Sequence, residues 1–303
     1  MSDHYPCQQL AAAYVAGLPL APQTEPNLGA ALRQTLAHPG NFVRAQLACK
    51  MSHAYGLPDD QAKQLAVAVE YFHTASLIFD DLPCMDDATQ RRGAPCVHQT
   101  HGEATAILAA LALINRAYAL LWKTFTNVPT ERQLAAANYV EKCLGVEGIL
   151  NGQSQDLHYA ELPPEAHSPQ KVASGKTVSL IRLSLVLPAL LGGAKPEEVK
   201  LLERLASCWG LSYQILDDLK DILQKPEQTG KTVARDASLH RPNMALAIGA
   251  KGAIQRLERF THLGDFTLAR LTTRLPALVF LTELSLRFQE ELAGLNAAAP
   301  FLA

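Results

Sequence analysis

The stretch LAVAVEYFHTASLIFDDLPCMDD, residues 65–87, decides the fold class of this chain. Its first part, Leu65 to Phe79, is an apolar, helix-like run, and its second part bunches aspartates from Asp80 onward. A core helix normally avoids such bunching, because like charges repel and an unpaired buried charge is costly. Pro83 disfavours helical geometry at the residue before it. We therefore expect a helix that ends at Asp80 and a short loop that brings Asp86 back towards it.

A second acidic cluster follows another apolar run, Leu205 to Leu216. It reads DDLKD and extends from Asp217 to Asp221. Because these two aspartates are four residues apart on a predicted helix, they share one face of it, whereas Asp218 points elsewhere. The sequence thus predicts a second helix with an acidic end.

Each acidic cluster is followed by cations: Arg91 and Arg92 come after the first, and Lys231 comes after the second. A single aspartate string is most often a solvated helix end or turn. Two strings at matched positions, each with cations downstream, indicate an anionic ligand that both clusters hold through a divalent metal. Carboxylates without paired Cys or His suit a hard cation such as Mg2+, which binds one or two carboxylates plus substrate phosphates.

Composition restricts the class of protein. The 303 residues carry a net charge of -2, so there is no basic excess that would bind nucleic acid. The six cysteines are scattered without a CxxC pair, which predicts free thiols in a reducing compartment. The first residues lack the features of a signal peptide, and the longest apolar runs are broken, for example by Arg182 and Pro188. We expect a soluble cytoplasmic protein without a membrane span.

Helical periodicity dominates the chain, and Gly and Pro punctuate it at intervals suited to helix ends. Without a low-complexity linker or a fixed-period repeat, the sequence predicts a single all-α domain over residues 1–303. The segment 103–126 is apolar almost all round, as in a helix buried in a core or at a subunit interface. The predicted helices are 7–18, 28–37, 42–55, 59–81, 103–126, 130–157, 168–191, 196–223 and 243–260.

At these motifs the chain resembles the polyprenyl (isoprenyl) diphosphate synthases, and among them the geranylgeranyl and bacterial farnesyl branches. Five motifs carry the resemblance, and they come in the family's order between Pro39 and Gly249. They are HTASLIFDDLPCMD (73–86), GQ with Asp156 (152–156), KT (176–177), YQILDDLKD (213–221) and GK (230–231). The resemblance implies an isoprenoid synthase fold, which is a single large helical bundle around a central active-site cavity, and a homodimer.

The resemblance also implies a reaction, the head-to-tail condensation of isopentenyl diphosphate with an allylic diphosphate, here to geranylgeranyl diphosphate. The allylic substrate loses diphosphate, and the double bond of isopentenyl diphosphate attacks the resulting cation. Mg2+, by resemblance three ions, and nearby cations would stabilise the departing charge. The residues that would contact metal are Asp80, Asp86 and Asp217. The full catalytic set implied is Asp80, Asp81, Asp86, Asp217, Asp218, Asp221, Lys176 and Lys231.

Substrate contacts follow from the same resemblance. The residues that would hold the allylic diphosphate are Arg91, Lys176 and Lys231. The residues that would offer dipoles near the cation are Thr177 and Gln214. The residues that would bind isopentenyl diphosphate are Arg44, His73 and Arg92.

The isopentenyl side departs from the family pattern GKRxRP. Asn41 stands where the family has Lys, while Arg44 is kept. A missing ammonium that faces a diphosphate costs about 1–3 kcal/mol of charge-assisted hydrogen bonding. Alternatives therefore stay open: a farnesyl or longer-chain synthase, a terpene synthase of the same fold that ionises a prenyl diphosphate without isopentenyl transfer, or a non-catalytic partner subunit.

Product length is predicted from the helix that ends at Asp80. Ala75 and Ser76 lie about 6 Å from Asp80 along this helix, where farnesyl synthases of the family place an aromatic that stops the growing tail. Both side chains are small here, so the tail passes them. Phe72, about 12 Å from Asp80, is the next large residue on that face and the predicted floor. This favours geranylgeranyl diphosphate as product.

Overall fold

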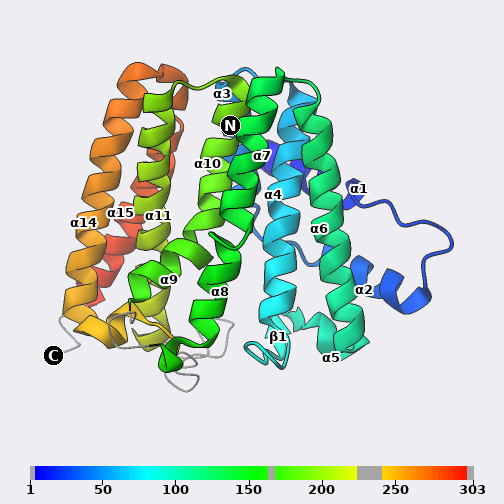
Figure 1. Ribbon diagram of the computed structural model, residues 1–303. Helices are drawn as coiled ribbons and strands as arrows, with labels where there is room; N and C mark the ends of the chain where they lie inside the picture. Colours follow the sequence, from blue (N-terminus) through cyan, green and yellow to red (C-terminus); the bar gives the residue numbers. More distant parts are fainter. Residues whose placement is uncertain (1–3, 163–167, 224–240, 299–303) are drawn as a thin grey trace. The chain divides into compact units, whose positions relative to one another are not determined.

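The computed structural model describes residues 4–162, 168–223 and 241–298 (Figure 1). Within these ranges the regular structure is helical except for two short antiparallel strands, β1 (Gln90–Arg91) and β2 (Ala94–Pro95). The prediction of an all-α fold is confirmed. The helices are α1 (His4–Ala16), α2 (Pro26–Ala37), α3 (Val43–Ala54), α4 (Asp59–Asp80), α5 (Val97–His101), α6 (Glu103–Phe125), α7 (Thr130–Leu144), α8 (Ile149–Leu157), η1 (Tyr159–Glu161), α9 (Pro169–Lys176), α10 (Val178–Gly192), α11 (Pro196–Leu223), α14 (Met244–Arg274), η3 (Pro276–Leu278) and α15 (Leu281–Ala298).

The chain divides into two compact units. The first unit holds residues 1–136 and 188–193, and the second holds residues 137–187 and 194–303. Two of the three boundaries fall inside α7 and α10, and the third lies in the short connection between α10 and α11. A single domain over residues 1–303 stays a prediction.

The first unit is built on α4, which packs against α3 and α6. Residues 65–72 of α4 are all buried, so this helix has partners on every side along its middle. On α6 the buried side chains are mostly small, as at Ala106, Ala109 and Ala110, which lets the two backbones approach closely. Within this unit, α4 ends beside the β1–β2 hairpin and α5 (Figure 1). The first acidic cluster is therefore held at the end of the best-buried helix of its unit.

The second unit is built on α11, which packs along α14 (Figure 1). Ile215, Leu216 and Leu219 of α11 form an apolar cluster with residues of α14 such as Met244 and Leu257. Each of these side chains is almost fully buried, so the end of α11 that bears the second acidic cluster is anchored to α14. The helix α15 packs against α14, and α8 packs against α9.

Three predicted helix boundaries are wrong. The segment 130–157 breaks between α7 and α8, where Gly148 has non-helical dihedral angles, with φ -112° and ψ -120°. The segment 168–191 breaks at Thr177, where α9 and α10 meet at a bend of 45°. The helix predicted to end at residue 260 continues to Arg274 and kinks at Gly249, whose φ is 75°. The hairpin, α5 and α15 were not expected from the pattern of the sequence.

The helix α6 is not buried all round within this chain. One face packs into the first unit, whereas Leu108, Leu111 and Trp122 on other faces are 53%, 48% and 74% exposed. By length and composition α6 could cross a membrane, and α9 with α10 could do so if they formed one bent span. Apolar helices in the core of soluble proteins have the same properties. By length and composition, α6 therefore fits both a membrane-spanning helix and a core helix of a soluble protein.

Candidate functional site

The loop after α4 folds back on the helix end as expected. The last residue of α4 is Asp80, and its carbonyl oxygen accepts a hydrogen bond of 2.9 Å from the Asp86 N–H. The Ala88 N–H bonds the Asp81 carbonyl oxygen at 3.1 Å. These backbone bonds hold Asp86 beside the helix end, so the two aspartates predicted to contact metal in this unit lie together.

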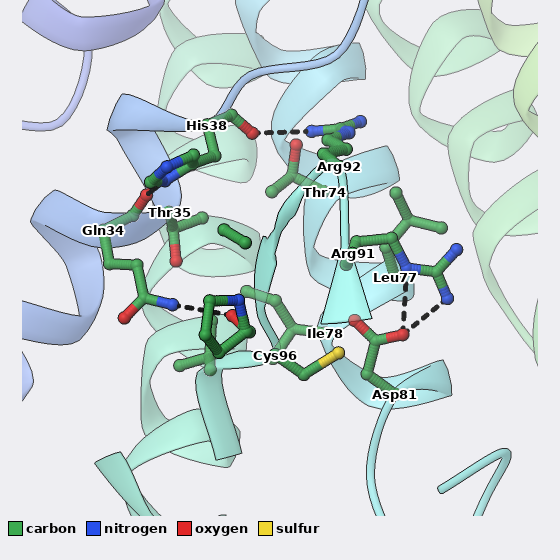
Figure 2. A pocket seen from close by; sticks show the side chains of 13 residues that line it. Gln34, Thr35, His38, Thr74, Leu77, Ile78, Asp81, Arg91, Arg92 and Cys96 are labelled. Carbon is green, nitrogen blue, oxygen red and sulfur yellow. Dashed lines mark hydrogen bonds and ion pairs between the residues drawn. The ribbon is translucent and has the colours of Figure 1, made fainter. Parts of the chain in front are cut away.

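Asp81 faces the hairpin instead. It is 4% exposed, and its Oδ1 accepts hydrogen bonds from Nε and Nη2 of Arg91 at 2.9 and 2.5 Å (Figure 2). Burial lowers the pKa of Arg91, but Asp81 and then Asp80 outweigh it and leave the pKa above its ordinary value. Arg91 therefore stays a cation whose direction Asp81 fixes.

The hairpin turn separates the two arginines. Arg92 and Gly93, the central residues of the turn, have φ values of 55° and 75°, as a tight two-residue hairpin requires. Arg91 lies at Asp81, whereas Arg92 reaches the carbonyl oxygen of His38 at 3.3 Å (Figure 2). The hairpin, α2 and α4 line a small, mostly apolar pocket, and both arginines lie along its wall. The turn thus gives adjacent residues different positions around the end of α4.

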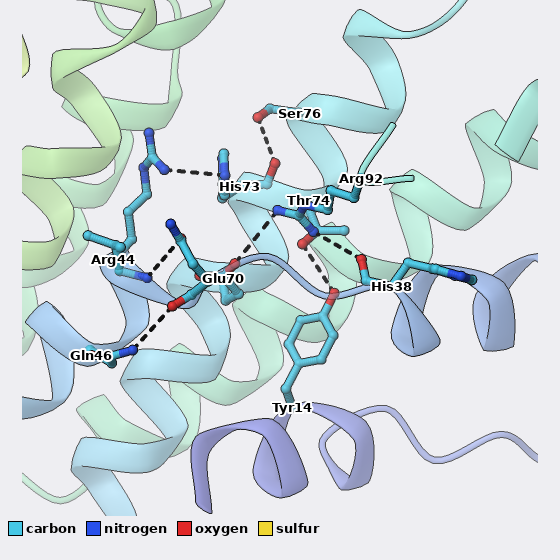
Figure 3. Close-up of polar contacts among 11 residues, drawn as sticks. Tyr14, His38, Arg44, Gln46, Glu70, His73, Thr74, Ser76 and Arg92 are labelled. Atoms are coloured by element: carbon cyan, nitrogen blue, oxygen red, sulfur yellow. Dashed lines mark hydrogen bonds and ion pairs between the residues drawn. The ribbon is translucent and has the colours of Figure 1, made fainter. Parts of the chain in front are cut away.

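Arg44 and His73 form the third part of this unit's polar site (Figure 3). Nη1 of Arg44 lies 3.2 Å from Nε2 of His73. Burial, followed by the charges of Arg44, Arg92 and Arg91, holds the pKa of His73 well below its ordinary value. The imidazole is therefore neutral at pH 7, and since Arg44 can only donate, Nε2 of His73 is the acceptor. The structure brings Arg44, His73 and Arg92 together, as the resemblance implied.

Glu70 is a member of this group that the sequence reasoning missed. It is 2% exposed, and its Oε1 lies 4.0 Å from Nη2 of Arg92 (Figure 3). Burial raises the pKa of Glu70, while Arg44 and Arg92 oppose that rise. The signal was present, because Glu70 is the one acidic residue inside the apolar run that leads to Asp80.

In the second unit, two glycines bring Lys176 to Asp156. A Cβ at Gly152 would lie 2.2 Å from the Lys176 backbone nitrogen, and one at Gly175 would lie 2.7 Å from the Gly152 Cα. The backbones of α8 and α9 therefore cross in direct contact, which only glycine permits. One turn along α8 from this crossing, Asp156 accepts a hydrogen bond of 2.8 Å from Nζ of Lys176.

Thr177 and Gln214 also meet. Oγ1 of Thr177 donates to Oε1 of Gln214 at 2.6 Å, and Nε2 of Gln214 donates to Oδ1 of Asp218 at 2.8 Å. Close packing makes this possible, because a Cβ on Gly210, one turn before Gln214, would lie 2.7 Å from Cγ2 of Val178. The predicted pair of dipoles is thus a bonded pair that continues to the second acidic cluster.

The aspartates of the second cluster separate as predicted. Asp217 is exposed, whereas Asp218 is 2% exposed and accepts the Met244 N–H at 2.7 Å. Asp221 lies partly exposed on α11. The predicted residues Gly230 and Lys231 lie outside the described residues.

Arg241 is a second residue that sequence reasoning missed. Its Nη1 donates to the carbonyl oxygen of Asp156 at 3.1 Å, so it lies on the same helix end that receives Lys176. The sequence gave no signal for a functional role of Arg241, because this arginine lies outside the five motifs of the resemblance.

The donors available to a metal are carboxylate oxygens. Within the ranges that the structure describes, no group of three or more His, Cys, Asp or Glu side chains forms a preformed metal cage. The side chains of Asp80 and Asp86 are partly exposed, and that of Asp217 is exposed. Few, accessible oxygen donors fit Mg2+, which keeps several waters or phosphate oxygens as ligands, better than they fit zinc.

The residues predicted to set product length lie where α4 meets α6. Phe72 is 6% exposed, and its ring stands edge-on to that of Tyr118 from α6, with centroids 5.0 Å apart. Ala75 is fully buried, and Ser76 is partly buried with its hydroxyl bonded to the His73 carbonyl oxygen at 2.9 Å. Phe72 is therefore one half of an aromatic pair between two helices.

Similarity to known proteins extends over most of the chain. Residues 25–261 match the family model described as polyprenyl synthetase. The chain is 36% identical over 247 residues to the mitochondrial geranylgeranyl pyrophosphate synthase 6 of Arabidopsis thaliana, which covers 78% of this chain and 74% of that protein. It is 34% identical over 224 residues to a chloroplastic geranylgeranyl pyrophosphate synthase of Capsicum annuum, which covers 74% of this chain and 61% of that protein.

Similarity to solved structures extends over 95% of the chain. A geranyltransferase from Helicobacter pylori, crystallised with magnesium and isoprenyl diphosphate, superposes with a TM-score of 0.83 at 25% identity and covers 95% of this chain and 96% of that chain. A geranyltranstransferase from Thermotoga maritima gives a TM-score of 0.74 at 25% identity, with 95% and 98% covered. With the family model matched over residues 25–261 and relatives above 30% identity, this chain belongs to the polyprenyl synthetase family.

Proposed function

We propose that this chain is a Mg2+-dependent trans-prenyltransferase that condenses isopentenyl diphosphate with an allylic diphosphate to give geranylgeranyl diphosphate. The observation that supports this most is the cationic group beside α4, where Arg44 of α3 and Arg92 of the hairpin turn flank a neutral His73, two helical turns before Asp80. A diphosphate is the ligand that such a pair of guanidinium groups recognises best. The relatives named as geranylgeranyl pyrophosphate synthases support the same reaction.

The chain's own residues have distinct roles in this proposal. Arg44, His73 and Arg92 bind isopentenyl diphosphate, and Arg91, oriented by Asp81, binds the allylic diphosphate with Lys176 and Lys231. The residues that hold metal are Asp80, Asp86 and Asp217. Bound Mg2+, as three ions, supplies positive charge that neutralises the leaving diphosphate. Asp221 supports the metal-binding face of α11.

The proposal also covers the oligomeric state of the protein and its cellular compartment. The exposed apolar side chains of α6, such as Leu111 and Trp122, support a homodimer in which α6 covers α6 of a second copy. The described cysteines are free thiols, which supports a reducing compartment such as the cytoplasm. The named relatives are mitochondrial or chloroplastic. Cell fractionation, rather than similarity to these relatives, is therefore the test of the compartment.

The test is a condensation assay with purified protein, Mg2+, isopentenyl diphosphate and each allylic diphosphate, with products resolved by chain length. A chelator should abolish turnover and Mg2+ should restore it. Asp80→Ala and Asp217→Ala should each lower the rate at least about a hundredfold, which is roughly 2.7 kcal/mol of barrier. Near-normal turnover of either variant would contradict a metal clamp that uses both clusters.

The assay also decides between the proposal and a terpene synthase of the same fold. The observation that favours this second candidate is Asn41, which stands in the loop before α3 where the family has a lysine. A terpene synthase would release diphosphate from an allylic substrate and never incorporate isopentenyl diphosphate. A non-catalytic partner subunit would do neither.

A further inference from the structure

A continuous line of hydrogen bonds crosses three elements of the second unit. It begins at Thr177, at the junction of α9 and α10, whose hydroxyl donates to Oε1 of Gln214 at 2.6 Å. It continues along α11, where Nε2 of Gln214 donates to Oδ1 of Asp218 at 2.8 Å. It ends at α14, where the Met244 N–H donates to Oδ2 of Asp218 at 2.7 Å. We name these four groups the Thr177–Met244 relay.

The direction of every hydrogen bond in the relay is fixed from its far end. The Met244 N–H can only donate, and it is one of the first N–H groups of α14, which have no partner inside the helix. Asp218 receives it on one oxygen and so offers its other oxygen as an acceptor. The amide of Gln214 must therefore turn its NH2 towards Asp218 and its oxygen towards Thr177. Because Oε1 of Gln214 can only accept, the Thr177 hydroxyl is the donor in the bond between them.

We propose that Asp218 is a positioning residue that sets the polarity of Thr177. This rests on the proposed function, in which Thr177 and Gln214 lie near the allylic cation. With its hydrogen committed to Gln214, the Thr177 hydroxyl turns its oxygen lone pairs away from the relay, where they stabilise a developing positive charge. A hydroxyl that pointed its hydrogen at the cation would oppose the same charge. Dipoles that are oriented before the reaction are the most effective kind of electrostatic stabilisation.

A carboxylate is required at residue 218 because it faces two donors. It is 2% exposed, so water cannot replace a lost partner freely. An asparagine of the same shape would turn its NH2 group either against the Met244 N–H or against the NH2 group of Gln214. If it keeps the bond to Met244, Gln214 must flip, and its NH2 group then faces Thr177. The Thr177 oxygen becomes an acceptor, and its hydrogen is released towards the substrate.

The first experiment compares Asp218→Asn with the wild type in steady-state kinetics. We expect kcat to fall about tenfold or more while KM for the allylic diphosphate changes little, since the lost interaction acts on the developing cation. The matched control is Asp265→Asn, because Asp265 on α14 also receives two donors, Ser285 and Gln289. That control should lower the melting temperature without lowering kcat. An unchanged kcat in Asp218→Asn would overturn the proposal.

A double-mutant cycle then separates positioning from loss of structure. Thr177→Val removes the hydroxyl, so Asp218→Asn should cause no further loss of kcat in that background, whereas it should retain its effect in Thr177→Ser. Equal losses of kcat in the Thr177→Val, Thr177→Ser and wild-type backgrounds would show that Asp218 only supports α14, and would also overturn the proposal. If Asp218→Asn does not fold, Gln214→Met cuts the relay while Asp218 still caps α14, and the same pattern is expected.

Failure of the relay and failure of the proposed function give different results. A wild-type protein that transfers no prenyl group would contradict the proposed function itself. A wild-type protein that is active, with additive effects of Thr177→Val and Asp218→Asn, would contradict only the role of the relay.

Discussion

Asn41 is part of the turn that starts α3. Its Oδ1 accepts the Val43 N–H at 3.4 Å, and its carbonyl oxygen accepts Nε2 of Gln46 at 3.2 Å. The side chain is exposed, so a longer residue meets no steric barrier there. The backbone contact to Gln46 does not depend on the side chain. Asn41 is therefore a site where charge can be changed with little effect on the fold.

The first prediction is that Asn41→Lys lowers KM for isopentenyl diphosphate. An added ammonium facing a diphosphate contributes about 1–3 kcal/mol, so a decrease of about tenfold is expected. KM for the allylic diphosphate should change much less, and Asn41→Gln is the control for side-chain length. An unchanged or raised KM for isopentenyl diphosphate would show that another cation has taken over the role of the missing lysine.

His73 makes stability depend on pH. Its pKa in the fold lies well below the ordinary value of 6.5, chiefly because it is buried and then because Arg44 and Arg92 repel a second positive charge. When the pH falls below about 6.5, His73 binds a proton in the unfolded chain but stays unprotonated in the folded protein. The free energy of unfolding should therefore fall with pH from about 6.5 downwards, until the folded pKa is reached.

The measurement is urea denaturation of the wild type and of His73→Gln between pH 7.5 and pH 5. Gln keeps an acceptor for Arg44 but binds no proton, so the variant should lose the part of the slope that arises from His73. The exposed His262→Gln controls for the removal of a histidine. Parallel curves for the wild type and His73→Gln would contradict a neutral, buried His73.

Prediction from sequence succeeds for residues whose positions are set locally. Pro83 and the spacing of Asp80 and Asp86 were sufficient to foresee the loop and its return. Glu70 was missed because its partners, Arg44 and Arg92, are distant in sequence and meet it only after α3 and the hairpin have packed. Partners supplied by tertiary packing leave no periodic signal.

At the scale of elements, Phe72, the predicted floor of the tail site, lies where α4 packs against α6. Phe72 on α4 stands edge-on to Tyr118 on α6, with ring centroids 5.0 Å apart. Phe72→Ala should therefore lengthen the product, and Phe72→Ala with Tyr118→Ala should lengthen it further, because each ring supports the other. Chromatography of dephosphorylated products measures the chain length.

The opposite change is expected one turn closer to Asp80. Ala75→Tyr or Ser76→Phe should shorten the product to farnesyl diphosphate, since a ring there blocks the tail. Ser76 is the sharper test, because Ala75 is fully buried and a large residue there also disturbs packing. A wild-type enzyme that stops at farnesyl diphosphate would show that the floor lies elsewhere.

Helix existence was easier to foresee than helix ends. The apolar periodicity of residues 59–81 and 196–223 located α4 and α11 closely. The break at Gly148 is one residue with non-helical dihedral angles, and the break at Thr177 is a bend of 45°, and neither changes the apolar pattern. The short α5 and the hairpin are held by tertiary hydrogen bonds, such as that from Nε2 of Gln34 to the Pro95 carbonyl oxygen at 2.9 Å.

At the scale of the whole molecule, the exposed apolar side chains of α6 are the surface on which the proposed homodimer rests. We expect the wild type to sediment as a dimer and the variant Leu111→Glu with Trp122→Glu to sediment as a monomer. A carboxylate in a buried apolar interface costs several kcal/mol. Leu286→Glu is the control, because Leu286 is also an exposed leucine, at 51%, but lies on α15. An unchanged mass would contradict this interface, and a wild type found in the membrane fraction would indicate that α6 inserts into lipid.

The crossing of α8 and α9 at Gly152 and Gly175 leaves no room for a side chain between the two backbones. The spacing of the two helices is therefore set by direct backbone contact, and no rotamer change can alter it. Asp156 and Lys176 lie close to this crossing and are joined at 2.8 Å. Any larger residue at either glycine would push α8 and α9 apart, and the carboxylate would then move away from the ammonium group.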